Sequence, residues 1–199
     1  MKIRRSSRAL VYQDRKSRGL LRRNEGSLCG AQIFGNDPAM MAEAAQIAVG
    51  ISGCDFLDIN MGCPMPKIAN NGDGSALMRD IPLAGRIIRA VADAVSVPVT
   101  VKTRLGWDRS CPTAVALARA AEENGAAAIT VHGRTKAMLY SGRADWDAIG
   151  EVVRAVSIPV IANGDISDPE QLLRCRAHSG ASLFMAGRAA FGDPWLFER

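Results

Sequence analysis

The feature of this sequence that most constrains its fold is a regular alternation of short apolar runs with longer helical patterns. Six runs of strand type are almost continuously apolar, which is typical of strands buried on both faces of a parallel sheet. They occupy residues 31–34, 56–59, 97–101, 127–131, 159–162 and 182–186. Helices are expected between them at residues 39–49, 83–95, 113–124, 148–156 and 170–177, several of them after a capping Asp. The chain therefore predicts serial strand–helix units.

Nearly every predicted strand ends in a short polar or glycine-rich motif, at residues 60–64, 102–104, 132–134, 163–165 and 187–188. A (β/α)8 barrel carries its chemistry at this end of its strands, so we predict an α/β fold of the TIM-barrel type. A doubly wound open sheet would place a GxGxxG-type phosphate loop after its first strand, and residues 32–35 (QIFG) do not provide one. Only about six of the eight β/α units are predicted. Either two strands lie in the basic N-terminus, or the chain is incomplete.

The positive charge of the chain is concentrated at its start. Residues 1–23 hold nine Lys and Arg side chains and one acid, Asp14, whereas the remaining residues carry more acids than bases. Such a cluster is either a solvated face or a contact for a polyanion such as nucleic acid. An Arg-rich start also resembles a mitochondrial presequence. No apolar run approaches the roughly 18 residues of a membrane span, so no membrane partner is expected.

The five cysteines do not form a recognisable disulfide or metal pattern. Their number is odd and no CxxC pair occurs, which argues against a disulfide framework and a structural zinc site. We therefore expect no metal and a reducing, cytoplasmic location. Cys63 differs from the others because Gly62 and Pro64 place it on a tight loop after a strand. A cysteine thiol of ordinary acidity is protonated at pH 7, so it can donate a proton as well as attack.

Three further groups of side chains at strand ends are candidate ligands. Lys102 and Arg104 are two residues apart, so both point to one face of their strand, where cations need an anion or water. His132 ends the next strand. In α/β barrels the last two loops often bind phosphate, and this chain has suitable groups there: Asn163, Gly164, Asp165, Gly187 and Arg188. Each motif taken alone could have a purely structural role. Their occurrence together, in this order at successive strand ends, favours a functional site.

Taken in order, these motifs resemble the tRNA-dihydrouridine synthases, and within them the bacterial B-type subgroup. The most specific is DINMGCPMPK at residues 58–67. Corroborating segments are NGDGSALM (71–78), VTVKTR (99–104), VHGRT (131–135), IANGD (161–165) and MAGRA (185–189). The resemblance extends from about Ser7 onward, and it assigns the basic start to the mature fold rather than to a presequence.

The resemblance implies an FMN-binding barrel that reduces selected uridines of tRNA to dihydrouridine with NADPH or NADH. It implies that Gln32, Lys102 and His132 contact the flavin ring system. The residues from Asn163 to Asp165, with Gly187 and Arg188, would hold its ribityl chain and phosphate. Asn60, Lys102 and Arg104 would face the flipped uracil, and Cys63 would be the catalytic acid.

Compared with that family, residues 1–199 are expected to form only part of the barrel domain. The first strand and most of the second are expected to be missing, as is a C-terminal helical tRNA-binding domain. Two strand edges would then be open, and the chain could self-associate through them. Two alternatives therefore stay open: an inactive fragment of such an enzyme, or a flavin barrel that reduces a small pyrimidine-like substrate.

Overall fold

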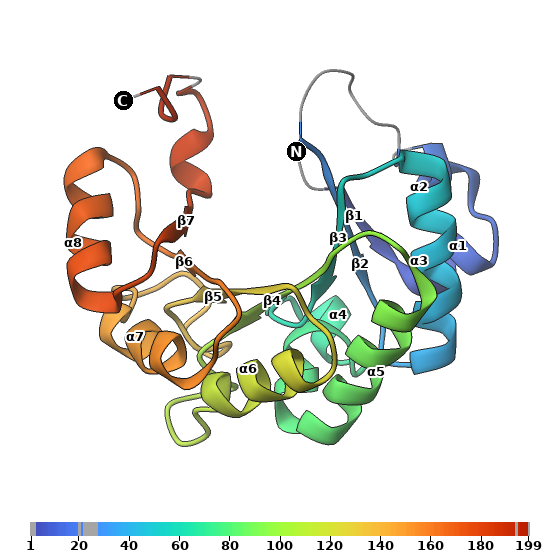
Figure 1. Ribbon diagram of the computed structural model, residues 1–199, viewed down its shortest axis with the longest axis horizontal. Coiled ribbons are helices and arrows are strands. Elements are labelled where there is room, and N and C mark those ends of the chain that lie inside the picture. Colours follow the sequence, from blue (N-terminus) through green and yellow to red (C-terminus); the bar gives the residue numbers. More distant parts are fainter. Residues whose placement is uncertain (1–2, 20, 22–27, 194, 199) are drawn as a thin grey trace.

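The protein is a curved parallel sheet covered on its outer side by helices. The computed structural model describes residues 3–19, 21, 28–193 and 195–198. Seven strands follow one another in chain order, and every neighbouring pair is parallel. They are β1 (Ile3–Ser6), β2 (Gly30–Phe34), β3 (Phe56–Asn60), β4 (Val99–Arg104), β5 (Ala128–His132), β6 (Val160–Asn163) and β7 (Leu183–Met185). β1 and β7 lie at the two ends of the arc (Figure 1).

Each of the strands β2 to β6 is followed by a helix that packs on the convex side of the sheet. These helices are α3 (Pro38–Ser52), α5 (Ile81–Ala94), α6 (Ala114–Glu123), α7 (Trp146–Ala155) and α8 (Pro169–Ser179). Four of them begin at an Asp whose carboxylate accepts a backbone N–H of the first turn: Asp37, Asp80, Asp145 and Asp168. The described residues thus contain the serial strand–helix units of a partial (β/α)8 barrel, as predicted.

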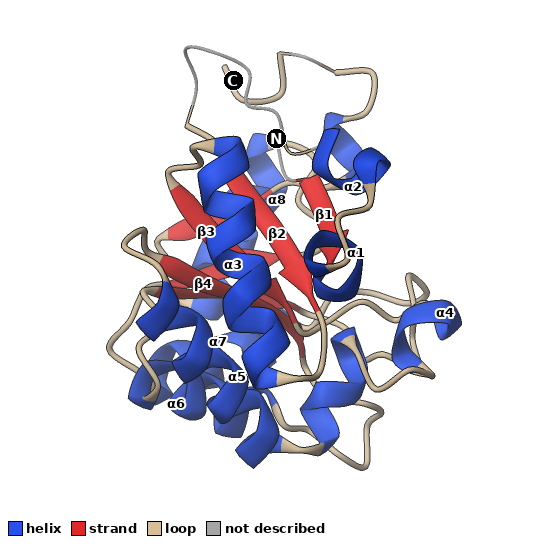
Figure 2. Cartoon of the chain, turned by 90° about the vertical axis from the view of Figure 1, so that its right-hand side faces the viewer, coloured by secondary structure: helices blue, strands red, loops and turns tan. Residues whose placement is uncertain are grey.

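Short helices occupy the connections at the rim. α1 (Ser7–Val11) and α2 (Arg15–Gly19) follow β1. α4 (Pro66–Ala69) and η1 (Gly74–Arg79) lie between β3 and α5, and η2 (Arg188–Ala190) follows β7. In the view of Figure 2, α3 crosses β2 and β3 as the outer layer, while α4 projects beyond the carboxyl ends of the strands. The rim elements therefore surround the end of the sheet where the polar motifs lie.

The six predicted strands are present, and a seventh adds to them. The sequence predicts no strand at the first residues and indicates that most of the family's second strand is missing, but Ile3–Ser6 pairs in parallel with β2 from Ile3–Ala31 to Ser6–Phe34. The sequence IRRS has one apolar residue in four, so hydrophobic pattern alone could not identify it.

The apolar core lies between the convex face of the sheet and the helices. Along β4, Val99, Val101 and Thr103 are buried on this outer face. Thr100, Lys102 and Arg104 alternate with them and point to the concave face. Strand alternation therefore directs the polar residues of the motifs to the inside of the arc. Among the described residues, no helix is long and apolar enough to cross a membrane.

Candidate functional site

The register of the sheet brings the candidate polar residues to one end of its concave face. Asn60, the last residue of β3, pairs with Lys102 of β4. Arg104 pairs with His132 of β5, and His132 pairs with Asn163 of β6. Because these residues end neighbouring parallel strands, sequence positions more than 100 residues apart share one mouth. The structure therefore assembles the predicted strand-end residues.

A chain of hydrogen bonds crosses the buried part of this mouth. Asp58, which is fully buried, accepts hydrogen bonds from Thr100 Oγ1 at 2.6 Å and from Gln32 Nε2. The Gln32 carbonyl in turn accepts from Asn60 Nδ2 at 3.3 Å. Asn60 Oδ1 accepts the backbone N–H of Cys63 at 2.9 Å. The amide of Gln32 and the side chain of Asn60 are thus held in fixed orientations, and β2 is linked to the cysteine loop.

Cys63 lies on a tight loop that packs against the end of β4. Asn60 Oδ1 also accepts the Gly62 N–H at 3.1 Å, and the Cys63 carbonyl accepts the Ser75 N–H at 3.2 Å. A Cβ at Gly62 would lie 2.9 Å from the Thr103 carbonyl carbon, so only glycine allows this approach. The Cys63 side chain is 4% exposed, yet it lies outside the main apolar core cluster. The loop placement expected from Gly62 and Pro64 is confirmed.

Lys102 bridges the middle of the mouth. Its Nζ donates to Asn163 Oδ1 at 2.9 Å, and Asn163 Nδ2 donates to the Met185 carbonyl at 2.7 Å. This contact joins β4, β6 and β7. A cation on the concave face is therefore oriented by a neutral amide.

Arg104 is buried and hydrogen-bonded to the backbone, which its position at a strand end did not indicate. It is 3% exposed, and its guanidinium donates to the backbone carbonyls of Gly62, Thr135 and Leu139 at 2.7 to 3.0 Å. It also lies 5.5 Å from the ring of Tyr140. Arg104 thus connects the cysteine loop to the loop after β5.

His132 lies beside an arginine–aspartate pair. Arg134 Nη1 is 3.2 Å from His132 Nε2, and Arg134 Nη2 contacts both oxygens of Asp165 at 2.7 and 2.8 Å. Burial, together with the cations Arg104, Lys102 and Arg134, lowers the pKa of His132 to about 3, and Asp165 only partly opposes this. His132 is therefore a neutral imidazole at physiological pH.

The loops after β6 and β7 form the outer part of the mouth. Burial raises the pKa of Asp165, but the Ala144 N–H and Arg134 outweigh this and hold it below the ordinary value. Arg188 is largely exposed; its guanidinium lies 3.9 Å from Asp165 Oδ1 and 5.0 Å from the Tyr140 ring. Gly187 is also exposed, and nothing described lies within 4 Å of a Cβ built on it. An exposed cation and open space thus adjoin a carboxylate that Arg134 and the Ala144 N–H hold in place.

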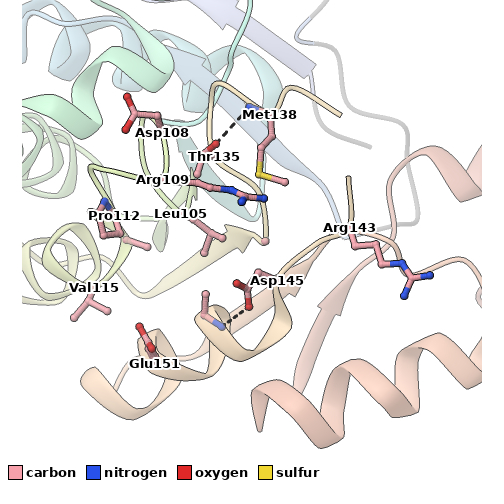
Figure 3. A pocket seen from close by; sticks show the side chains of 13 residues that line it. Leu105, Asp108, Arg109, Pro112, Val115, Thr135, Met138, Arg143, Asp145 and Glu151 are labelled. Atoms are coloured by element: carbon pink, nitrogen blue, oxygen red, sulfur yellow. Dashed lines mark hydrogen bonds between the residues drawn. The ribbon is translucent and has the colours of Figure 1, made fainter. Parts of the chain in front are cut away.

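A separate cavity lies outside the mouth. It has a volume of about 540 Å³ and lies between the loops after β4 and β5 and the first turns of α6 and α7 (Figure 3). Leu105, Met138 and Val115 contribute apolar surface, and Arg109 and Glu151 contribute charge. None of the predicted site residues is among its described lining residues, so we do not place the functional site there.

Three residues of this site are not among the predicted site residues. Asp58 could have been recognised from the sequence, because a carboxylate within a buried strand needs hydrogen-bond partners. Arg134 stood in the same motif as His132, but nothing in the sequence gave its contact with Asp165. Tyr140, half-exposed between Arg104 and Arg188, lies in a loop without a predictive pattern.

The donor set of the mouth fits a flavin mononucleotide better than a metal. It offers cations and neutral N–H donors, which suit an electron-rich ring system and a phosphate. His132 Nδ1 makes no hydrogen bond within the described residues although the side chain is only 8% exposed, so a donor or acceptor is available there. Among those same residues, no group of three or more His, Cys, Asp or Glu could hold a metal ion.

Fold and site together define a class: an α/β protein of the TIM-barrel type with a cation-rich mouth and a cysteine loop at the carboxyl ends of its strands. Solved structures support the fold. The chain aligns with an amine oxidase (HisD) from Pseudomonas geniculata N1 with a TM-score of 0.58 and 19% identity over 80% of this chain and 27% of that one. It aligns with a mandelate racemase/muconate lactonizing enzyme from Jannaschia sp. CCS1 with a TM-score of 0.55 and 18% identity, over 75% and 36%.

The family follows from the sequence matches. The model of the dihydrouridine synthase (Dus) family matches residues 6–199, and the chain belongs to that family. It is 48% identical over 189 residues to tRNA-dihydrouridine synthase B of Pseudomonas aeruginosa, covering 94% of this chain and 57% of the relative. The protein of the same name from Vibrio vulnificus is 44% identical, covering 97% and 60%. The chain therefore spans less than two thirds of the length of these relatives.

Proposed function

We propose that this protein takes part in the FMN-dependent reduction of specific uridines in tRNA to 5,6-dihydrouridine, with NADPH or NADH as reductant. The observation that carries the proposal is the convergence of Gln32, Lys102, His132 and Asn163 on one mouth, with the Cys63 loop tied to the same mouth by Asn60. The names of its relatives, tRNA-dihydrouridine synthase B, support tRNA as the substrate class.

Residues of the concave face would bind the flavin. Gln32 presents a fixed amide, Lys102 a cation and His132 a neutral imidazole to the ring system. Lys102 would stabilise negative charge on the pyrimidine edge, because a preoriented cation interacts strongly with developing charge. When bound, FMN would supply the hydride for reduction.

The outer loops would bind the phosphate end of the cofactor. Arg188 is exposed and can donate two parallel hydrogen bonds to a phosphate. Space beside Gly187 admits a group close to the backbone. The Asp165 carboxylate accepts hydrogen bonds from Arg134 and from the Ala144 N–H, so its side chain would act by orienting Arg188 and the loop rather than by contacting the phosphate.

Cys63 would supply the proton. Saturation of the uracil C5–C6 bond needs one hydride and one proton, and Cys63 Sγ is the candidate donor for C5. Asn60 holds the cysteine loop through two backbone N–H groups, which preorganises the thiol. Arg104 would contribute mainly by fixing this loop through the Gly62 carbonyl, together with any contact to the base.

The tRNA would also contact basic side chains of the N-terminal segment. Among the described residues of the N-terminal segment, Arg8, Arg15 and Lys16 are exposed. Phosphate contacts there would offset the few kcal/mol needed to flip a uridine out of its stack. None of the five cysteines, all of them in the described part of the chain, forms a disulfide bond, which is compatible with action in the reducing cytoplasm. Pairing of the β1 and β7 edges between copies is a further way to complete the sheet.

The experiment compares Cys63→Ala with Cys111→Ala, a loop cysteine outside the site. Each purified protein is incubated with unmodified tRNA, FMN and NADPH, and tRNA nucleosides are examined by mass spectrometry for uridine that has gained two hydrogens. Cys63→Ala should abolish product while flavin stays bound, and Cys111→Ala should leave product unchanged. Unchanged product in Cys63→Ala would contradict the proposal. Turnover of free uracil without tRNA would instead favour a small-molecule reductase.

A further inference from the structure

Arg134 is a buried arginine whose hydrogen-bonding groups are nearly all used. Its side chain is 2% exposed. Nε donates to the Ser141 carbonyl at 3.0 Å, and Nη2 donates to the Gly142 carbonyl at 2.6 Å and to both oxygens of Asp165. The remaining contact is from Nη1 to His132 Nε2 at 3.2 Å. Arg134 is not among the predicted site residues and has no role of its own in the proposed chemistry.

The chemistry of the guanidinium determines which group is the donor in the hydrogen bond between Arg134 Nη1 and His132 Nε2. An arginine in a protein is always protonated and has only N–H donors. His132 Nε2 must therefore be the acceptor, and it can accept only when it carries no proton. The single proton of a neutral imidazole is then on Nδ1.

We propose that Arg134 is a positioning residue that fixes His132 as the neutral tautomer protonated on Nδ1, so that His132 presents an N–H donor to the ligand in the mouth. The identity of that ligand as a flavin rests on the proposed function, whereas the tautomer does not.

The packing of the imidazole agrees with this direction. A Cβ at Gly164 would lie 2.8 Å from His132 Cδ2 and 3.2 Å from Nε2, so that edge of the ring lies against the loop after β6. Nδ1 is on the other edge of the ring. Within the described residues it has no hydrogen-bond partner, and it is not among the fully buried unsatisfied atoms. The N–H on Nδ1 is therefore directed away from the protein contacts and is available to an acceptor.

Burial of the ring, and then the charges around it, keep the imidazole neutral. The groups that face His132 are Lys102 and Arg104 from β4, Arg134 from its own loop, and Asp165 from the loop after β6. Three cations oppose one carboxylate, so protonation of the imidazole is disfavoured. Asp165 in turn is engaged by Arg134, which holds the end of β5, the 141–142 loop and the end of β6 in one unit.

The first experiment measures the tautomer directly by nuclear magnetic resonance. The chain has two histidines, so protein labelled with ¹⁵N-histidine gives two imidazole patterns, and His178→Gln assigns them. The long-range ¹H–¹⁵N spectrum at pH 7, recorded without FMN or tRNA, should show His132 with Nδ1 protonated and Nε2 bare. A majority of the Nε2–H form, or an imidazolium at pH 7, would overturn the proposal in the unaltered protein, whether or not any variant folds.

The second experiment separates positioning from general support of the fold. Arg134→Met removes the donor, and the Nε2–H form of His132 should become the major tautomer. Asp165→Asn weakens the ion pair but leaves the Arg134–His132 contact, and the tautomer should be unchanged. If Arg134→Met folds and keeps the Nδ1–H form, Arg134 does not position His132.

FMN titration of the same proteins, followed by quenching of flavin fluorescence, adds the functional readout. Arg134→Met should bind FMN at least tenfold more weakly than the unaltered chain, whereas a tenfold loss in Asp165→Asn alone would point to the phosphate end and contradict a role through His132. If the unaltered chain shows the expected tautomer but binds no FMN, the proposed function fails and the positioning role stands.

Discussion

Gly164→Ala is the substitution whose effect on the mouth can be worked out most fully. Gly164 has a φ of +118°, and a Cβ there would meet His132 Cδ2 at 2.8 Å and the Ala144 Cβ at 2.9 Å. A side chain at positive φ costs about 1–2 kcal/mol, and forcing an extra carbon into a packed contact costs about 1–3 kcal/mol. The expected loss in free energy of unfolding is therefore about 2–5 kcal/mol. Both neighbours belong to the site, so relief of the clash must displace His132 or the loop before α7.

The matched control is Gly180→Ala. Gly180 ends α8 with a φ of +68°, and nothing described lies within 4 Å of a Cβ there. The Gly180→Ala variant should lose only about 1–2 kcal/mol of the free energy of unfolding, which is the cost of placing a side chain at a residue with positive φ. Urea unfolding followed by circular dichroism gives both values, and FMN titration gives the effect on the site. Equal stability of the two variants, with equal FMN affinity, would refute the idea that the Gly164 approach sets the position of His132.

Two further predictions concern His132 and the cysteine loop. Because folding lowers the pKa of His132 from 6.5 to about 3, the unfolded chain binds more protons between these values, and stability should fall as the pH decreases from about 6.5. The loss should approach about 1.4 kcal/mol per pH unit, and His132→Asn should remove it from urea unfolding curves between pH 4 and pH 6.5; an unchanged slope would contradict the neutral imidazole. Asn60→Ala removes the acceptor for the Gly62 and Cys63 N–H groups, so alkylation of the 4% exposed Cys63 by iodoacetamide should accelerate at least several-fold, whereas Asn71→Ala on an exposed turn should have no effect. Equal alkylation rates would show that Asn60 does not hold the loop.

Much of the fold could be predicted because its signals are local. A strand buried on both faces is a run of apolar residues, and an Asp before a Pro marks the start of α3 and α8, as the structure confirms. β1 could not be found in this way because Ile3–Ser6 is mainly polar, and it becomes a strand through pairing with β2. Pairing is a tertiary effect that a hydrophobic pattern does not record.

The site was predictable as a set of positions but not as a set of contacts. Strand ends placed Lys102, His132 and Asn163 together, since the carboxyl ends of parallel strands meet. Arg104 was interpreted as a ligand contact, whereas the structure gives it three backbone carbonyls that lie 31 to 42 residues away in the sequence. Such partners depend on loop conformations. The contact between Arg134 and Asp165 could not be predicted for the same reason, because it also joins two loops.

The most direct test of the central claim is the visible absorption spectrum of the purified 199-residue chain, mixed with FMN and passed through gel filtration. The polar mouth at the carboxyl ends of the strands predicts that flavin absorption elutes with the folded protein, and that Lys102→Met, which removes the cation oriented by Asn163, loses most of it. A folded chain, confirmed by circular dichroism, that elutes without flavin would contradict the assignment of this mouth as a flavin site.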